Sequence, residues 1–264
     1  MTPDQYTDVL YAVEGTTALV TINRPDRYNA FRGRTIDELV DAFRRSWADR
    51  RVRAVILTGA GDKAFCAGGD QKQRAETGDY GPTEHGIFQV EYLHSLIRDI
   101  PKPVIAAVNG LAIGGGHVLH VLCDISIAST TARFGQAGPR VGSWDAGYGT
   151  AYLARVVGEK RAREIWYFTR QYDAETAERW GLVNRVVAPE QLDAAVMELA
   201  GQIGSLSQLA VRTGKAAFYQ QVELPQGPAY GLMTEAIASN ATSEDAQEGM
   251  SAFLQKRKPI WKGR

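Results

Sequence analysis

The sequence predicts a mixed α/β protein in which a core of strands and helices is followed by a helical C-terminal region. Three observations support this prediction. Short apolar or β-branched runs alternate with helical stripes over roughly the first 130 residues. Glycine-rich turns follow two of these runs. From position 150 onward the patterns are helical, and 264 residues are enough for one large core with a helical extension.

The first elements form a βαβ-like unit. The run at 16–22 is rich in β-branched residues and ends at an Asn-Arg-Pro-Asp turn, which predicts a strand followed by a loop. Apolar residues at i, i+3, i+4 and i+7 predict an amphipathic helix over 35–49. A buried strand is expected over 53–58.

The next elements repeat this order around two glycine turns. The first turn lies within 64–71, and the polar stretch that follows to 83 lacks periodicity, which favours a mobile segment over a site. A helical stripe then covers 85–99. A strand is expected at 103–108, a glycine triplet at 114–116 opens a helix over 117–122, and a short strand follows at 124–128.

The loop at 134–149 contains five glycines, which are too many for the interior of a helix or strand. Ser143 and Asp145 are two residues apart, so in extended backbone both side chains point to one side and can address one substrate group. Alternatively, they only cap the helix that follows. Helices are then expected at 150–157, 160–168, 174–180, 191–203, 206–221 and 230–255. We place a boundary between a core at 1–200 and a helical region at 201–264.

Composition narrows the classes of partner. Thirty basic residues balance thirty acidic ones, so we expect neither a nucleic acid nor a membrane surface as partner. Cys66 and Cys123 do not suggest a disulfide framework, which favours the cytoplasm. No export signal or membrane-spanning run is evident, and no metal site is expected.

The two glycine turns together suggest an oxyanion hole. A helix that begins at the glycine triplet leaves its first N–H groups unpaired, and the helix dipole favours negative charge there. One such N–H and one from the other turn can stabilise a developing oxyanion, with Gly115 and Gly69 as the donors. The alternative is that each glycine only forms a turn.

Three segments carry a resemblance to a known family. Phe-Cys-Ala-Gly-Gly-Asp at 65–70, Ile-Gly-Gly-Gly at 113–116 and Phe-Gly-Gln at 134–136 resemble the signature of the crotonase (enoyl-CoA hydratase/isomerase) superfamily. This resemblance implies a spiral of repeated ββα units, a C-terminal helical region used for trimerisation, and assembly as a homotrimer or homohexamer. It also implies that the Gly69 and Gly115 amides hold the thioester oxygen of a coenzyme A substrate as an enolate.

The resemblance also points to a branch. The two glutamates of enoyl-CoA hydratases correspond to Val118 and Gly138 here, and neither side chain can do acid–base chemistry, so simple hydration is not expected. Two enzymes of the superfamily, 2-ketocyclohexanecarboxyl-CoA hydrolase and 1,4-dihydroxy-2-naphthoyl-CoA synthase, are resembled more closely by the segments at 29–32, 69–71, 115–120, 138–145 and 162–167. We therefore expect hydrolytic ring opening of a cyclic β-keto acyl-CoA. The alternatives are the synthase reaction, an intramolecular Claisen condensation on a cyclic or aromatic acyl-CoA, and a catalytically impaired binding protein.

The resemblance assigns roles to individual residues. Ser143 donates a hydrogen bond to the second carbonyl, Asp145 holds or moves a proton, and Tyr80 closes over the substrate. The residues expected to bind the substrate or its coenzyme A are Arg27, Ala30, Ala67, Asp70, Gln71 and Lys256, of which Arg27 and Lys256 would meet the coenzyme A phosphates. No tightly bound cofactor is expected, although Gln136, Gly138 and Trp166 match a pocket that binds bicarbonate as a borrowed base. Trp166 is otherwise a core aromatic residue. A tyrosine that both relatives carry near the C-terminus is replaced by Asn240 or Ala241.

Overall fold

The computed structural model describes residues 1–144 and 147–264, and their strands form two sheets. The larger sheet has the order β1 (Val9–Glu14), β2 (Thr17–Ile22), β3 (Ala54–Gly59), β5 (Val104–Val108), β7 (Ile125–Ser129) and β10 (Arg185–Val187). The smaller one has the order β4 (Ala64–Cys66), β6 (Leu111–Ile113), β8 (Arg133–Gly135) and β9 (Tyr172–Asp173). Only the β1–β2 and β8–β9 pairs in these sheets are antiparallel.

The chain order of the strands produces the expected spiral. β3, β5 and β7 each lie in the larger sheet, and the strand that follows each of them in the chain lies in the smaller one. Helices α2 (Gln71–Thr77) and α3 (Val90–Asp99) follow the first of these strand pairs, and α4 (Gly115–Leu122) follows the second. The predicted fold of repeated ββα units is therefore confirmed.

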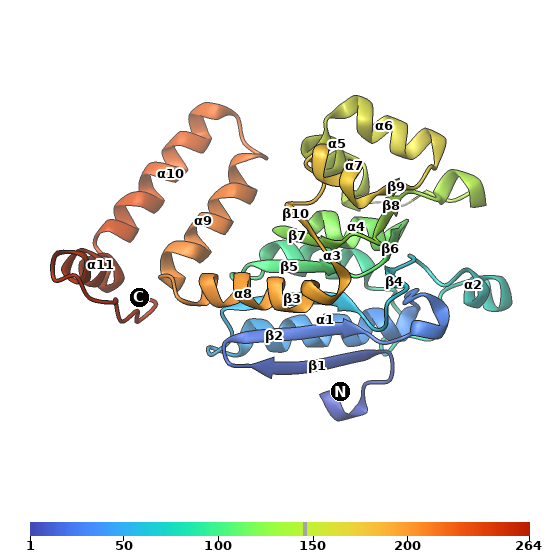
Figure 1. Cartoon of the computed structure of the whole chain (residues 1–264), viewed down its shortest axis with the longest axis horizontal. Coiled ribbons are helices and arrows are strands. Elements are labelled where there is room, and N and C mark those ends of the chain that lie inside the picture. The colour runs from blue at the N-terminus through green and yellow to red at the C-terminus, as the bar shows by residue number, and fades with distance from the viewer. Residues whose placement is uncertain (145–146) are drawn as a thin grey trace.

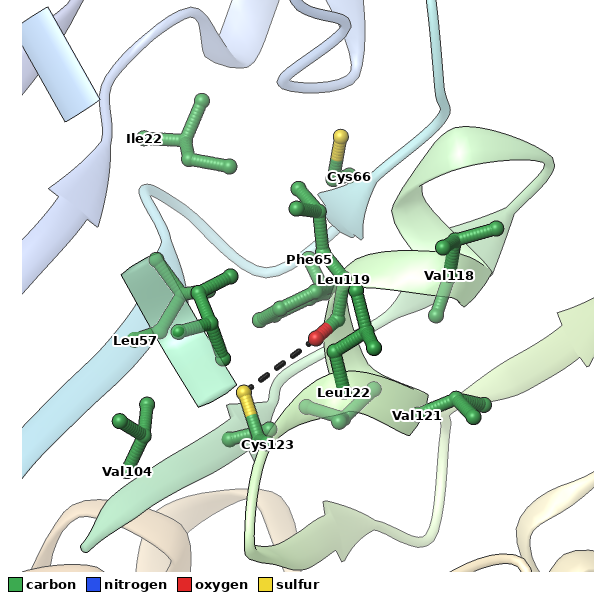
Figure 2. Close-up of a cluster of buried hydrophobic side chains, with 14 of the residues drawn as sticks. Ile22, Leu57, Phe65, Cys66, Val104, Val118, Leu119, Val121, Leu122 and Cys123 are labelled. Atoms are coloured by element: carbon green, nitrogen blue, oxygen red, sulfur yellow. Dashed lines mark hydrogen bonds between the residues drawn. The ribbon is translucent and has the colours of Figure 1, made fainter. Parts of the chain in front are cut away.

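Two apolar layers hold the larger sheet between helices. On one face, α1 (Gly33–Ala48) and α3 pack with α4 in the main core. Figure 2 shows Leu119 and Leu122 of α4 beside Phe65 and Leu57, and Cys123 donates a hydrogen bond to the Leu119 carbonyl (3.3 Å). On the other face, α8 (Leu192–Gly204) covers a second apolar cluster. The remaining helices before α8 are α5 (Ala151–Val157), α6 (Glu159–Phe168) and α7 (Ala174–Arg179).

The C-terminal helices extend away from the core. These are α9 (Gln208–Gln221), α10 (Gln226–Ala241) and α11 (Glu244–Leu254), and Figure 1 shows α10 and α11 at the end of the molecule opposite α2. The continuous helix expected over 230–255 is wrong. The chain breaks after α10, where the Ser243 hydroxyl accepts a hydrogen bond from the Ala246 amide (3.0 Å) and starts α11. No helix among the described residues is long and apolar enough to cross a membrane.

Other differences concern the short elements. β1 was not expected, and the three-residue strands of the smaller sheet lie inside segments that the sequence presents as glycine turns. The polar stretch after the first turn contains α2, because the Asp70 side chain caps that helix. The helix expected from position 85 begins at Val90.

Candidate active site

The two glycine turns lie against each other. β4 pairs with β6 in parallel, so the turns that follow these strands stand at the same edge of the smaller sheet. A Cβ placed on Gly68 would lie 3.1 Å from the Gly115 nitrogen and 3.0 Å from the Ile113 carbonyl oxygen. Gly68 has a φ of +87° and Gly114 a φ of +57°, values that favour glycine. The fold thus brings the two predicted oxyanion donors to one place.

Neither donor amide is committed elsewhere. Gly115 is the first residue of α4, so its N–H has no partner within the helix. Within the described part of the chain, the N–H groups of Gly69 and Gly115 donate no hydrogen bond. Two free backbone donors next to a helix N-terminus can stabilise an anionic oxygen.

Aromatic rings cover both glycines. A Cβ on Gly69 would lie 2.7 Å from the Tyr80 hydroxyl oxygen, and a Cβ on Gly115 would lie 2.6 Å from Cζ of Phe31. Tyr80 stacks on Phe88 with a centroid distance of 4.9 Å, and Phe31 lies 6.1 Å from Tyr80. The Arg74 guanidinium lies over Tyr80 at 5.9 Å. Tyr80 is therefore at the site, as expected, and Phe31 and Phe88 were missed as its walls.

Asp70 anchors the first turn. Its carboxylate accepts a hydrogen bond from the Gln73 amide (3.1 Å) and pairs with Arg24 at 2.8 Å. Arg24 also lies 3.5 Å from Asp8. Burial by itself raises the pKa of Asp70, but the Gln73 amide and the Arg24 guanidinium bring that pKa below its ordinary value. The exposed Gln71 side chain donates to the Gly69 carbonyl (3.1 Å), so both residues shape the turn.

The expected coenzyme A contacts fall into two places. Arg27 is exposed, Ala30 is buried nearby with its amide donating to the Arg27 carbonyl (3.0 Å), and the Ala67 amide donates to the Tyr28 carbonyl (3.0 Å). Lys256 instead comes two residues after the end of α11, the helix that Figure 1 shows at the end of the molecule opposite α2. The structure therefore does not bring Lys256 of this chain to Arg27.

The described part of the glycine-rich loop at 134–149, which carries the predicted catalytic residue Ser143 and is called the catalytic loop below, packs around Trp166. Ser143 is half-buried, and its amide donates to the Gly138 carbonyl (2.9 Å). Trp144 is 61% exposed and stacks on the buried Trp166 with a centroid distance of 4.6 Å. The Trp166 indole donates to the Gly149 carbonyl (3.3 Å). Asp145, the expected proton carrier, lies outside the described residues.

The residues expected to form a bicarbonate pocket, Gln136, Gly138 and Trp166, leave no open space beside Gly138. A Cβ on Gly138 would lie 2.7 Å from the Ser143 carbonyl oxygen and 3.5 Å from Cζ3 of Trp166, so these atoms take the space beside Gly138. Gln136 is buried, and its Nε2 donates to the Gly114 carbonyl (3.5 Å). Its Oε1 has no hydrogen-bond partner among the described residues. Among the residues that the structure describes, no cluster of three or more His, Cys, Asp or Glu side chains is arranged to bind a metal ion.

Comparisons with known proteins identify the family of the chain. The enoyl-CoA hydratase/isomerase family model matches residues 12–264. The enoyl-CoA hydratase of Bacillus anthracis is 32% identical, with a TM-score of 0.91 over 98% of this chain and 100% of that chain. The enoyl-CoA hydratase of Mycobacterium smegmatis is 36% identical, with a TM-score of 0.87 over 97% of this chain and 99% of that one. A human enoyl-coenzyme A hydratase domain-containing protein is 32% identical, with a TM-score of 0.88 over 97% and 100%. The chain therefore belongs to the enoyl-CoA hydratase/isomerase family, the crotonase superfamily.

Proposed function

We propose that this crotonase-superfamily acyl-CoA enzyme breaks a C–C bond β to the thioester by hydrolytic ring opening of a cyclic β-keto acyl-CoA. The observation that carries the proposal is the chemistry of two positions. Val118, buried against the catalytic loop, and Gly138 stand where the resemblance places the two glutamates of a hydratase. These positions supply no carboxylate to add water across a double bond. Both free amides suited to an enolate are nevertheless present.

The proposed reaction uses those amides at its hardest step. Water adds to the ring ketone carbon, the bond from that carbon to the thioester α-carbon breaks, and the electron pair becomes the thioester enolate. The N–H groups of Gly69 and Gly115 stabilise the enolate oxygen, each by about 10²–10³ in rate. Ser143 donates to the ketone oxygen, and Asp145 takes a proton from water and returns one to the α-carbon.

The aromatic walls favour a cyclic acyl group. Phe31 precedes α1, Tyr80 and Phe88 lie in the connection between α2 and α3, and the three rings gather at the glycine pair with centroid distances of 4.9–6.2 Å. Flat aromatic faces give a ring more contact than they give a flexible chain. A cyclic or aromatic acyl-CoA is therefore the substrate class that we propose.

A second candidate is the reverse chemistry, the intramolecular condensation of the naphthoyl-CoA synthase reaction. The unpartnered Oε1 of buried Gln136 favours it, because this acceptor could receive the hydroxyl proton of a bicarbonate ion. Gln136 and the ring of Trp166 would line the ion's place, the Ser143 carbonyl that now lies beside Gly138 would have to move to admit it, and bicarbonate would supply the base. Under this proposal, activity rises saturably with bicarbonate in degassed buffer, and a bicarbonate-independent rate rejects it.

We also propose a homotrimer or homohexamer in the cytoplasm. Large apolar side chains are exposed on the C-terminal helices, among them Phe218, Tyr230, Ile237 and Phe253. Burying such surface against another copy is favourable, and it could carry Lys256 to a neighbouring site. The buried free thiols of Cys66 and Cys123 suit a reducing compartment. Light scattering after size-exclusion chromatography measures the assembly directly, and a monomer would contradict the proposal.

The decisive experiment is mass spectrometry in ¹⁸O-labelled water. We expect 2-ketocyclohexanecarboxyl-CoA to gain one water with one ¹⁸O in the new carboxyl group. Crotonyl-CoA, the control substrate, should remain unchanged. Hydration of crotonyl-CoA without ring opening would identify a simple hydratase, and binding of both thioesters without turnover would identify a binding protein.

A further inference from the structure

Arg98 of α3 is surrounded by three tyrosine rings from three different elements. Its guanidinium carbon lies 4.5 Å from the ring centroid of Tyr148, 4.9 Å from that of Tyr152 and 5.1 Å from that of Tyr219. The side chain is 12% exposed, and its nearest carboxylate, Glu223, lies 3.7 Å away and is half-exposed. Cation–π contacts are stronger where the cation is shielded from water, as it is here. The rings therefore supply much of what holds this charge in place.

One ring belongs to the catalytic loop. Tyr148 lies in the short 3-10 turn Gly147–Gly149, and His94, one helical turn before Arg98, meets the edge of its ring at 6.3 Å. The next residue, Gly149, accepts the Trp166 indole hydrogen bond, and Trp144 stacks on that same indole. Tyr148 thus belongs to the packing that anchors the segment carrying Ser143.

Another ring belongs to the C-terminal region. Tyr219 lies on α9, and its hydroxyl donates to Asp124 (3.1 Å), which also pairs with the buried Lys215 of α9 (2.7 Å). Between α9 and the core lies a cavity of about 660 Å³, lined by Tyr152, Tyr219, the charged side chains of Asp124, Arg155 and Lys215, and apolar side chains. Because this cavity interrupts apolar packing, the polar contacts of Lys215 and Tyr219 and the Arg98 cluster carry much of the attachment of α9.

We propose that Arg98 is a positioning residue that couples the seating of α9 to the placement of the catalytic loop. Arg98 touches neither glycine turn, so it acts through Tyr148. Displacing α9 moves the Tyr219 ring away from the Arg98 guanidinium. Arg98 is then less fixed in position, and so is the Tyr148 ring that it contacts at the end of the catalytic loop. The C-terminal helical region thereby controls the rate of the chemical step, an inference that rests on the proposed ring-opening function.

Hydrogen exchange tests the coupling without any substrate. Tyr219→Phe keeps the ring and removes the hydroxyl, whereas Tyr219→Leu removes both. We expect Tyr219→Leu to increase amide exchange over 147–157, outside α9, clearly more than Tyr219→Phe, which loses the hydroxyl contact to Asp124 but keeps the ring beside Arg98. Equal exchange over 147–157 in Tyr219→Leu and the wild type would overturn the proposal.

Kinetics tests the consequence. Arg98→Met should lower kcat for 2-ketocyclohexanecarboxyl-CoA by about 10- to 100-fold with little change in KM, because a misplaced loop impairs the reacting geometry more than binding. Arg98→Lys, which keeps the cation, should restore most of kcat. Arg44→Met is the matched control, because it removes a surface cation–π contact to Tyr92 (5.4 Å) and should leave kcat unchanged.

The two proposals fail in different ways. A wild-type enzyme that does not open the ring rejects the proposed function, while the exchange result still decides the coupling. An Arg98→Met variant that is folded and retains wild-type kcat rejects the positioning role. The same holds if Arg98→Lys is as impaired as Arg98→Met while both variants remain folded.

Discussion

Lowering the pH from about 7.5 to about 5 should destabilise this protein through its buried histidines. His117 and His120 lie on α4, whose first residue is Gly115, and His94 lies on α3. Both ring nitrogens of His94 and His117 lack a hydrogen-bond partner among the described residues. Burial lowers the pKa of His117 to about 3 and that of His94 to about 4, and it places the pKa of His120 well below 6.5.

The sign and size of the effect come from proton linkage. Because the folded pKa values are depressed, the stabilisation is fully present above pH 6.5 and is lost as the pH falls toward the folded values. At pH 5, about 1.5 units below the unfolded pKa of 6.5, protonation of His94 and of His117 each lowers the unfolding free energy by about 2 kcal/mol. His94 and His117 together remove about 4 kcal/mol, a large part of an ordinary unfolding free energy of about 5–15 kcal/mol. Carboxylates with depressed pKa values, such as Asp8 and Asp70, act only at lower pH, near and below 3.8.

Urea unfolding at several pH values between about 5 and 7.5 measures this loss. His94→Gln should remove about 2 kcal/mol of the pH dependence. His85→Gln, a change at an exposed histidine, is the control and should leave the pH dependence unchanged. The reasoning is refuted if the wild type loses less than about 1 kcal/mol over this range, or if His85→Gln flattens the profile as much as His94→Gln.

Three further predictions concern the site. Gly115→Pro and Gly115→Ala both add a Cβ that meets Phe31, and proline is tolerated at the first position of a helix, so the difference between the two variants reports the loss of the N–H group. Gly115→Pro should have about 10²-fold lower kcat than Gly115→Ala. Equal rates in two folded variants would rule out the oxyanion role of this amide. Asp145→Asn should keep the melting temperature and abolish ring opening, and wild-type kcat in that variant would show the catalytic assignment to be wrong. Asp70→Asn should reduce the unfolding free energy measured in urea by about 2 kcal/mol. The loss is smaller than for an isolated buried ion pair, because Arg24 still pairs with Asp8. An unchanged urea midpoint would argue against the role of Asp70 in anchoring the first glycine turn.

The sequence predicted the elements whose burial repeats regularly. β2, β3, β5 and β7 are buried runs, and α1 carries a regular apolar stripe, so periodicity alone located them. β1 escaped because it is an edge strand on which an apolar residue such as Leu10 is 54% exposed, which blurs the alternation. The break between α10 and α11 was missed although the sequence carries a signal for it, since Ser243 followed by Glu244 and Asp245 is a helix-start pattern.

The site was predictable in its backbone and less so in its side chains. The glycines that form the turns are visible in the sequence, since few other residues adopt their φ values. The partners of those turns are remote in the chain, and Arg24 meets Asp70 across 46 residues. Tyr80 was placed at the site only by family resemblance, because no local pattern distinguishes a loop tyrosine over Gly69 from one on the surface.

The repeat of the fold explains why the site lies where it does. The parallel pairs β4–β6 and β6–β8 align the carboxyl ends of three short strands at one edge of the smaller sheet. The first strand leads to Gly69, the second to Gly115 and the third to the loop that carries Ser143. Each ββα unit therefore delivers one turn to the same place, and the amides of two units come together with the polar loop of the third. The proposed change of reaction therefore requires different residues only around these turns, as at Val118 on α4 and Gly138 in the loop, while the strands that align the turns stay the same.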